Sequence, residues 1–166
     1  MPTKLLFSPD RIPHSMTLSV QSDDHYMELA LEEAQKAYDK GEIPVGAVVE
    51  CEQRILARTH NSTEQLTDVT AHAEVMAITA ASQALGGKFL ERCRFFITLE
   101  PCVMCAGALY WARPAELILG AKDPKKGFTL TDSGLLHPKT SMKEGVKKEE
   151  ASELLRDFFR TKRDDP

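Results

Sequence analysis

The sequence predicts an α/β protein, a three-layer α/β/α sandwich built on a mixed five-stranded sheet. Apolar segments of strand length alternate along the chain with segments of helical periodicity, which favours parallel strands with helices on both faces of the sheet. The chain has 166 residues, of which 42% are hydrophobic and 28% charged. This composition is ordinary for a globular protein, and the length suffices for one packed domain.

The chain is expected to hold one folded domain, residues 22–163. Residues 1–21 show no apolar periodicity and are predicted to be a poorly ordered extension. No apolar run approaches the roughly 20 residues of a membrane span, and the apolar block at residues 5–7 is too short for a signal peptide. We therefore expect a cytoplasmic protein without a membrane partner, whose four cysteines are thiols or metal ligands rather than disulfides.

The first half of the domain predicts a helix, a hairpin and a second helix. Ser22 can cap the first helix, whose apolar residues recur at helical spacing until Gly41 ends it. Two strand-like segments, 45–50 and 55–59, are joined by a polar turn and predict a β-hairpin. A polar loop then leads into a helix that stops at residues 86–87.

The second half continues the alternation and ends in an amphipathic helix. The strand before the second motif is rich in aromatic and β-branched residues, and Pro114 ends the helix after it. The predicted strands are residues 94–99 and 117–119, followed by a short extended segment at residues 142–146. The predicted helices are residues 102–113 and 149–162.

Two short motifs supply metal-ligand side chains at the starts of two predicted helices. His72, Cys102 and Cys105 offer three ligands of the type zinc prefers, which leaves one coordination position open, as in catalytic sites. Thr70 is expected to cap one helix, and Pro101 to occupy the first position of the other. Helix N-termini favour thiolate over thiol, so this context favours a catalytic zinc site over unconnected core residues.

Glu74 lies two residues after the histidine of this motif. A carboxylate so close to a metal is either a ligand or a group that moves protons in a hydrolytic reaction. Cys51 and Cys93 have no such neighbours in the sequence and are interpreted as core thiols.

Several sequence blocks together resemble the bacterial tRNA-specific adenosine deaminases, members of the cytidine and deoxycytidylate deaminase superfamily. The similarity extends over about residues 24–163, and its blocks include Pro44–Val48, Thr70–Glu74, Thr98–Ala108 and Asp157–Arg160. It implies the cytidine-deaminase-like fold and hydrolytic conversion of adenosine to inosine at the wobble position of tRNA. In that reaction zinc, held by His72, Cys102 and Cys105, would activate water, and Glu74 would be the catalytic proton carrier.

The resemblance also implies the substrate-binding residues and the partners. The partners are a tRNA anticodon stem-loop and a second copy of the chain in a homodimer, and Glu100 is expected to act through its main chain. The implied binding residues are Asn61, Ala71, Leu99 and Glu100 around the base, and Asp123, Phe158, Phe159 and Arg160 toward the RNA.

The charge distribution agrees with an RNA-binding face near the C-terminus. The chain carries a net charge of −4, but residues 113–163 hold 12 basic and 8 acidic side chains, a net of +4. Adjacent Phe158 and Phe159 cannot share one helix face, so one ring is expected to point away from the core. An aromatic ring beside cations suits single-stranded nucleic acid, although a merely solvated basic helix has the same charge pattern.

Two alternative functions remain open from the sequence. Residues 109–114, Leu-Tyr-Trp-Ala-Arg-Pro, resemble the guanine deaminases, which act on a free base. The C-terminal block at residues 157–160 argues against that alternative, because guanine deaminases end differently. The second alternative is a non-catalytic zinc-binding subunit that associates with RNA, against which the intact Glu74 argues.

Overall fold

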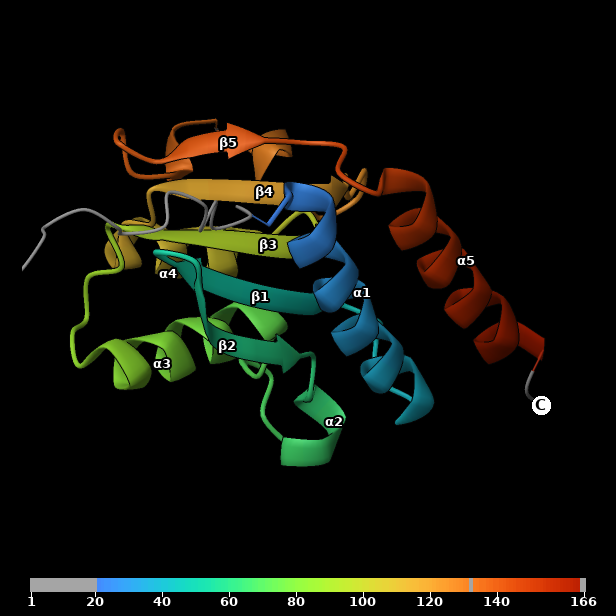
Figure 1. Cartoon of the computed structure of the whole chain (residues 1–166). Helices are drawn as coiled ribbons and strands as arrows, with labels where there is room; N and C mark the ends of the chain where they lie inside the picture. The colour runs from blue at the N-terminus through green and yellow to red at the C-terminus, as the bar shows by residue number, and fades with distance from the viewer. Residues whose placement is uncertain (1–20, 132, 165–166) are drawn as a thin grey trace, which may run out of the picture.

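The computed structural model of the protein describes residues 21–131 and 133–164 (Figure 1). The predicted extension over residues 1–21 lies outside this range except for its last residue. The centre of the fold is a five-stranded sheet with the strand order β2-β1-β3-β4-β5. The strands are β1 (Gly46–Cys51), β2 (Arg54–His60), β3 (Cys93–Leu99), β4 (Glu116–Ala121) and β5 (Ser141–Lys143).

The sheet is mixed, as predicted from the sequence. β1 pairs antiparallel with both β2 and β3, whereas β3, β4 and β5 run parallel to one another. The parallel pairs are joined by crossover connections, of which the helix between β3 and β4 is the clearest. The hairpin joining β1 and β2 turns at Glu52 and Gln53, both with positive φ, a conformation that their residue types do not signal.

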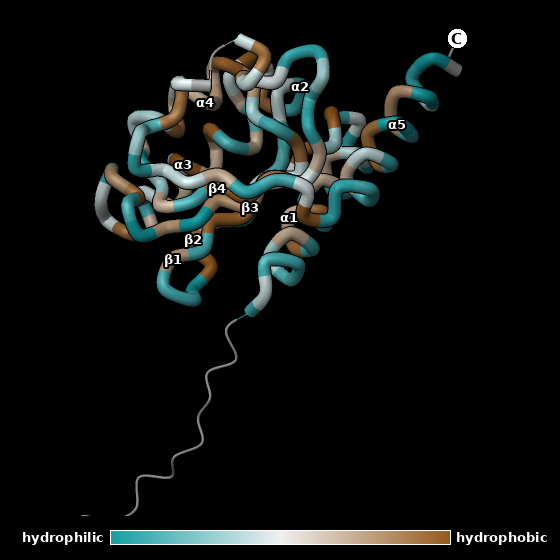
Figure 2. The backbone as a smooth tube through the Cα atoms, turned by 90° about the horizontal axis from the view of Figure 1, so that it is seen from above, coloured by the Kyte–Doolittle hydropathy of each residue, from teal (hydrophilic) through white to brown (hydrophobic). Residues whose placement is uncertain are grey.

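Helices cover both faces of the sheet and complete the predicted three layers. α1 packs on one face, and α3 and α4 pack on the other, so that in Figure 2 they lie on opposite sides of the strands. α5 contacts β4 near its start and then extends beyond the sheet (Figure 1). The helices are α1 (Asp23–Asp39), α2 (Thr63–Leu66), α3 (Ala73–Leu85), α4 (Val103–Ala112) and α5 (Lys148–Asp164), with short 3₁₀ turns at Phe128–Leu130 and Ser133–Leu135.

Alternate residues of each central strand enter different cores. Val48 and Phe96 face α1, whereas their neighbours Val49, Phe95 and Ile97 face α3 and α4. Successive strand side chains point to opposite faces, so a strand covered on both faces is apolar throughout. Cys51 and Cys93 are buried free thiols in this core, as interpreted from the sequence.

Gly46 lets α1 approach β1 closely at the first residue of the strand. A Cβ atom there would lie 1.9 Å from the carbonyl oxygen of Ala30 and 2.6 Å from the nitrogen of Ala34. Only a residue without a side chain fits, so helix and strand are held together where the connecting loop, residues 40–45, enters β1.

α2 was not expected, because the sequence between β2 and α3 reads as a polar loop. In the part of the chain that the structure describes, no helix has the length and apolar character needed to cross a bilayer.

Candidate active site

The two motifs converge at the N-termini of α3 and α4. His72 is the N-cap residue of α3 and Cys102 that of α4, both with extended backbone. The predicted roles of Thr70 as N-cap and Pro101 as first helical residue are therefore each wrong by two positions. The Thr70 N–H and hydroxyl both donate to Asp68 Oδ1, at 2.8 and 2.7 Å, so Thr70 belongs to the preceding turn.

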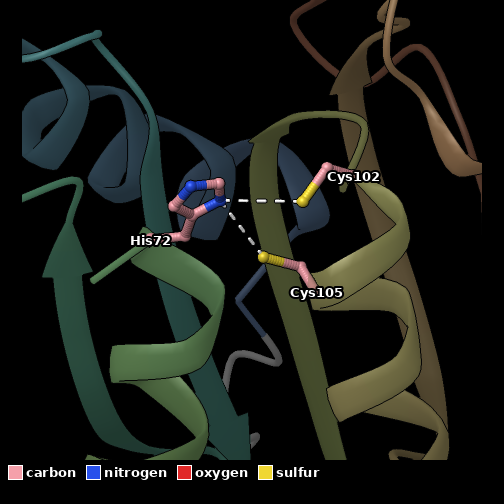
Figure 3. Close-up of side chains that lie close together, drawn as sticks. All are labelled: His72, Cys102 and Cys105. Carbon is pink, nitrogen blue, oxygen red and sulfur yellow. Dashed lines mark hydrogen bonds between the residues drawn. The ribbon is translucent and has the colours of Figure 1, made fainter. Parts of the chain in front are cut away.

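The three ligand atoms are arranged as a zinc site requires (Figure 3). His72 Nδ1 lies 3.7 Å from Cys102 Sγ and 3.4 Å from Cys105 Sγ, and all three atoms lie within 4.8 Å of one another. Usual zinc–nitrogen and zinc–sulfur bonds at a tetrahedral angle place such atoms about 3.6 Å apart. The donor types and their spacing therefore fit zinc.

The two cysteines have opposite electrostatic environments. A hydrogen bond from Cys105 lowers the pKa of the Cys102 thiol to about 5, helped by the backbone N–H groups of Met104 and Cys105. The same contact, together with burial, raises the pKa of Cys105. One thiolate therefore forms readily, whereas the other requires the positive charge of a bound metal.

Glu74 lies in the first turn of α3, beside the ligands, and lines a cavity together with His72 and Cys102. Its side chain is buried, and desolvation raises its pKa to about 7. The candidate metal cluster consists of His72, Cys102 and Cys105 without Glu74. This placement favours the proton-carrier role over the ligand role.

His72, Cys102 and Glu74 border a cavity of about 580 Å³, a volume typical of small-molecule sites, whereas Cys105 is buried behind its wall. Its inner wall is formed by the motifs and by the segments before β1 and after β2. Its outer wall is formed by α5 and the loop after β4. The lining residues with polar or charged side chains are Asn61, Thr63, His72, Glu74, Glu100, Cys102, Asp123, Lys125, Lys126, Lys162 and Arg163.

Of the residues predicted to surround the base, Asn61 lines the cavity and Ala71 does not. Asn61 follows β2 and lines the cavity with a mostly buried side chain. Ala71 is buried and is not among the lining residues, and its carbonyl accepts a hydrogen bond from the Ser62 N–H at 3.0 Å. Ala71 therefore supports the segment that carries Asn61.

The Glu100 carboxylate has a structural role of its own, and the expected contact between the Glu100 main chain and the base stays a prediction. The buried carboxylate accepts hydrogen bonds from the Asp123 N–H at 3.1 Å and from the Thr129 N–H at 3.0 Å. Gly127 makes this approach possible, because a Cβ there would lie 2.4 Å from the Glu100 carboxyl carbon. Glu100 thus holds the loop of the outer wall, a role that requires contacts 23 to 29 residues away in sequence.

The two adjacent phenylalanines of α5 face different surroundings, as predicted. Phe158 is 5% exposed and packs against the Tyr38 ring at 5.6 Å, so it is unavailable for stacking. Phe159 is 46% exposed and lines the cavity. Arg160 pairs with Asp157 and borders a second cavity rather than the first.

The second cavity, of about 790 Å³, adjoins the first, and the two share six lining residues: Leu99, Asp123, Lys125, Leu155, Phe159 and Arg163. Several cations surround it although the whole chain is acidic. The sequence shows a basic C-terminal third, but not that its cations gather around one cavity. They are Lys122, Lys125, Arg156, Arg160 and Arg163.

Comparison with known proteins agrees with this site. The family model for the cytidine and deoxycytidylate deaminase zinc-binding region matches residues 20–121, which contain every predicted metal ligand. A tRNA-specific adenosine deaminase of Aquifex aeolicus (strain VF5) is 43% identical over 142 residues, covering 82% of this chain and 93% of that protein.

Two solved structures represent the two enzymatic alternatives for the substrate. One, from work on A-to-I editing by tRNA:A34 deaminases at the wobble position of transfer RNA, has a TM-score of 0.73 and 41% identity, covering 79% of this chain and 99% of the other. A guanine deaminase of Bacillus subtilis has a TM-score of 0.60 and 33% identity, covering 70% and 72%. Both likenesses confirm the predicted cytidine-deaminase-like fold. The chain belongs to the cytidine and deoxycytidylate deaminase family and, within it, to the tRNA-specific adenosine deaminases.

Proposed function

We propose that this protein, through one domain spanning residues 22–163, is a zinc-dependent hydrolase that converts adenosine to inosine at the first anticodon position of a tRNA. One observation carries the proposal: two members of a His/Cys/Cys cluster, His72 and Cys102, line the same cavity as a buried glutamate that is not part of the cluster. The relatives that cover most of this chain are tRNA-specific adenosine deaminases. Because the substrate is a tRNA used in translation, we place the enzyme in the cytoplasm.

The reaction exchanges the amino group at C6 of adenine for oxygen and releases ammonia. His72, Cys102 and Cys105 would hold a zinc ion, which when bound would supply the activation of water at neutral pH. Glu74 accepts a proton from the attacking water and delivers protons to N1 of the ring and to the departing amino group. Burial of Glu74 keeps bulk water away from the group that carries these protons.

The outer wall supplies the features needed to bind RNA. Phe159 presents an exposed ring to the cavity, and cations such as Lys125, Arg156 and Arg163 border the adjoining groove. Stacking rings beside cations bind single-stranded nucleotides, and an anticodon loop offers bases that are already unpaired. A free purine bound beside the zinc ligands is too small to extend into this second groove. The groove therefore favours an RNA substrate over guanine.

The test is deamination of an anticodon stem-loop RNA with adenosine at its first anticodon position by the zinc-loaded protein. A matched RNA carries that adenosine one loop position later. We expect inosine, measured by nuclease digestion and mass spectrometry, in the first RNA only. Equal conversion of both RNAs, or of neither with zinc bound, would contradict the proposal.

We further propose that the enzyme is a homodimer, joined through the exposed face of α4. This face carries Val103, Met104, Tyr110 and Trp111, four large apolar side chains at helical spacing, and Trp111 is 69% exposed. Val103 directly follows the metal ligand Cys102, and Met104 directly precedes Cys105. A second copy bound to this face would therefore lie beside the cavity.

The oligomeric state tests this interface. Trp111→Glu is expected to convert a dimer into a monomer in light scattering and sedimentation, because it places a charge in an apolar contact. Ile55→Glu changes an exposed apolar residue on the edge strand β2, away from α4, and is expected to leave the dimer intact. A wild-type monomer at micromolar concentration would rule the interface out.

A further inference from the structure

A buried carboxylate, outside the chemistry described above, lies in the loop between α1 and β1. Glu42 is 1% exposed, and its backbone N–H donates to the Ala37 carbonyl at the end of α1, at 2.9 Å. Glu42 does not line the cavity. A buried carboxylate is costly unless donors surround it, so its hydrogen-bond partners indicate what it does.

The donors to this carboxylate come from the segment that follows β2. Asn61 Nδ2 and Thr63 Oγ1 donate to Oε2 of Glu42 at 3.3 and 3.2 Å, and the Gln65 N–H donates to Oε1 at 2.8 Å. Asn61 and Thr63 line the cavity that also holds Glu74. Glu42 therefore supports one wall of the cavity from behind.

The chemistry of a carboxylate determines which way the Asn61 amide points. An asparagine side chain has an NH₂ and a carbonyl of nearly the same shape, so its hydrogen-bond partners decide its orientation. The Glu42 carboxylate accepts hydrogen bonds and donates none, which holds the NH₂ of Asn61 toward it.

This orientation leaves the other end of the amide for a ligand. Among the described residues, Asn61 Oδ1 has no hydrogen-bond donor, and it is not among the buried polar atoms without a partner. It is therefore accessible from the cavity that Asn61 lines. An acceptor at this point suits an N–H or O–H of a bound nucleoside.

We infer that Glu42 is a positioning residue that holds Asn61 with its carbonyl oxygen ready to accept a hydrogen bond from the target nucleoside. The inference rests on the proposed function. Glu42 neither touches the substrate nor moves a proton. It acts by making one of two amide orientations the ground state of the empty cavity, which improves nucleoside binding by preorganisation.

Glu42→Gln tests the inference with almost no change in shape. A glutamine cannot accept from all three donors, because its own NH₂ must face either the Gln65 N–H or the Asn61 side chain. The matched control is Glu50→Gln. Glu50 is equally buried but lies toward the far end of β1, where it accepts from Arg94 Nε at 2.8 Å and does not line the cavity.

Binding is measured in the Glu74→Ala background, so that the RNA is not converted. The two ligands are an anticodon stem-loop with adenosine at the first anticodon position and the same RNA with an abasic site there. We expect Glu42→Gln to lower the preference for adenosine over the abasic RNA about 3- to 10-fold, the effect of one hydrogen bond. Affinity for the abasic RNA should not change, and Glu50→Gln should leave the preference intact.

Two further variants separate positioning from a loss of folding. On an Asn61→Ala background, Glu42→Gln should have no additional effect on the preference, because the amide it orients is gone. Glu42→Asp keeps a group that only accepts, and it should retain more of the preference than Glu42→Gln.

The outcomes distinguish this inference from the proposed function. An unchanged preference in Glu42→Gln, equal weakening of both RNAs, or a full additional effect on Asn61→Ala would overturn the inference alone. If the Glu74→Ala parent binds both RNAs equally, the proposed function and the inference are both overturned.

Discussion

The two walls of the cavity are built in different ways. The inner wall carries its metal ligands and Glu74 on the first turns of α3 and α4, which pack on the sheet with buried side chains. The outer wall consists of α5 and the loop after β4, whose cations are mostly exposed. A few long-range bonds hold that wall, such as those of Glu100 to the loop and of Tyr38 to Asp157.

This difference suggests a division of labour. A rigid, buried wall suits chemistry, because proton carriers and metal ligands must be held in place. An exposed, cationic wall suits recognition of a flexible anion such as RNA. Changes in the inner wall should therefore lower turnover, and changes in the outer wall should lower RNA affinity.

Glu74→Ala is expected to have the largest effect on turnover. Removal of the proton carrier should lower the single-turnover rate on stem-loop RNA at least about 10²- to 10⁴-fold. Zinc content and RNA affinity should stay at wild-type values, as measured by plasma mass spectrometry and fluorescence anisotropy. Glu64→Ala, an exposed glutamate on α2, is the control. Loss of zinc in Glu74→Ala would show that Glu74 is a ligand instead.

Removal of the metal should abolish activity and reduce stability. Cys102→Ser is expected to lower the zinc content well below one per chain and to lower the melting temperature, because a metal that binds only the folded state stabilises it. Cys93→Ala removes a buried thiol outside the cluster and should keep its zinc. If Cys102→Ser holds zinc as tightly as wild type, the proposed ligand set is wrong.

The phenylalanine pair separates recognition from folding. Phe159→Ala should weaken stem-loop binding by about 1–3 kcal/mol with little change in melting temperature, because its exposed ring is available to stack. Phe158→Ala should instead cost about 3–5 kcal/mol of folding stability, because its ring is buried against Tyr38. The reverse pattern in titrations and thermal melts would contradict the assignment.

Gly127→Ala should disturb the outer wall more moderately. The added Cβ would displace the Glu100 carboxyl or the Asp123 carbonyl, which it would approach to 2.4 and 2.6 Å. We expect a loss of about 1–3 kcal/mol in stability and weaker RNA binding at unchanged zinc content. Gly87→Ala meets no atom within 4 Å and should behave as wild type in the same assays.

The smallest expected effect is on acid stability. Burial disfavours the ionised form of Glu33, but hydrogen bonds from Lys36 and His60 outweigh it and hold the pKa of Glu33 below its ordinary value of 4.5. Its stabilising contribution is therefore complete above about pH 4.5 and lost as the pH falls through the lower, folded-state pKa. Urea denaturation should show that Glu33→Gln flattens this acid dependence, whereas Glu28→Gln, an exposed change on the same helix, should not.

The sequence was sufficient for the features that depend on local patterns. Strand and helix alternation predicted the mixed five-stranded sheet, and the His-x-Glu and Cys-x-x-Cys motifs predicted the residues that converge at the zinc site. Both predictions succeed because the residues concerned are close in sequence or lie at the ends of regular helices and strands.

The rest depends on contacts between distant segments. Asp68 engages Thr70, so helix α3 begins two residues later than propensity predicts. The carboxylates of Glu42 and Glu100 find their partners about 20 to 30 residues away, which no local pattern reveals. The pattern of α5 showed that its two phenylalanines must separate, but only packing against Tyr38 decided which one is buried.

The most direct test of the central claim is a parallel assay of the zinc-loaded wild-type protein on the anticodon stem-loop with adenosine at its first anticodon position and on free guanine. We predict inosine in the RNA and no xanthine from guanine, because the chemistry of the inner wall acts on what the outer wall binds. Xanthine without inosine would contradict the assignment of the outer wall to RNA and would make the enzyme a deaminase of a free purine.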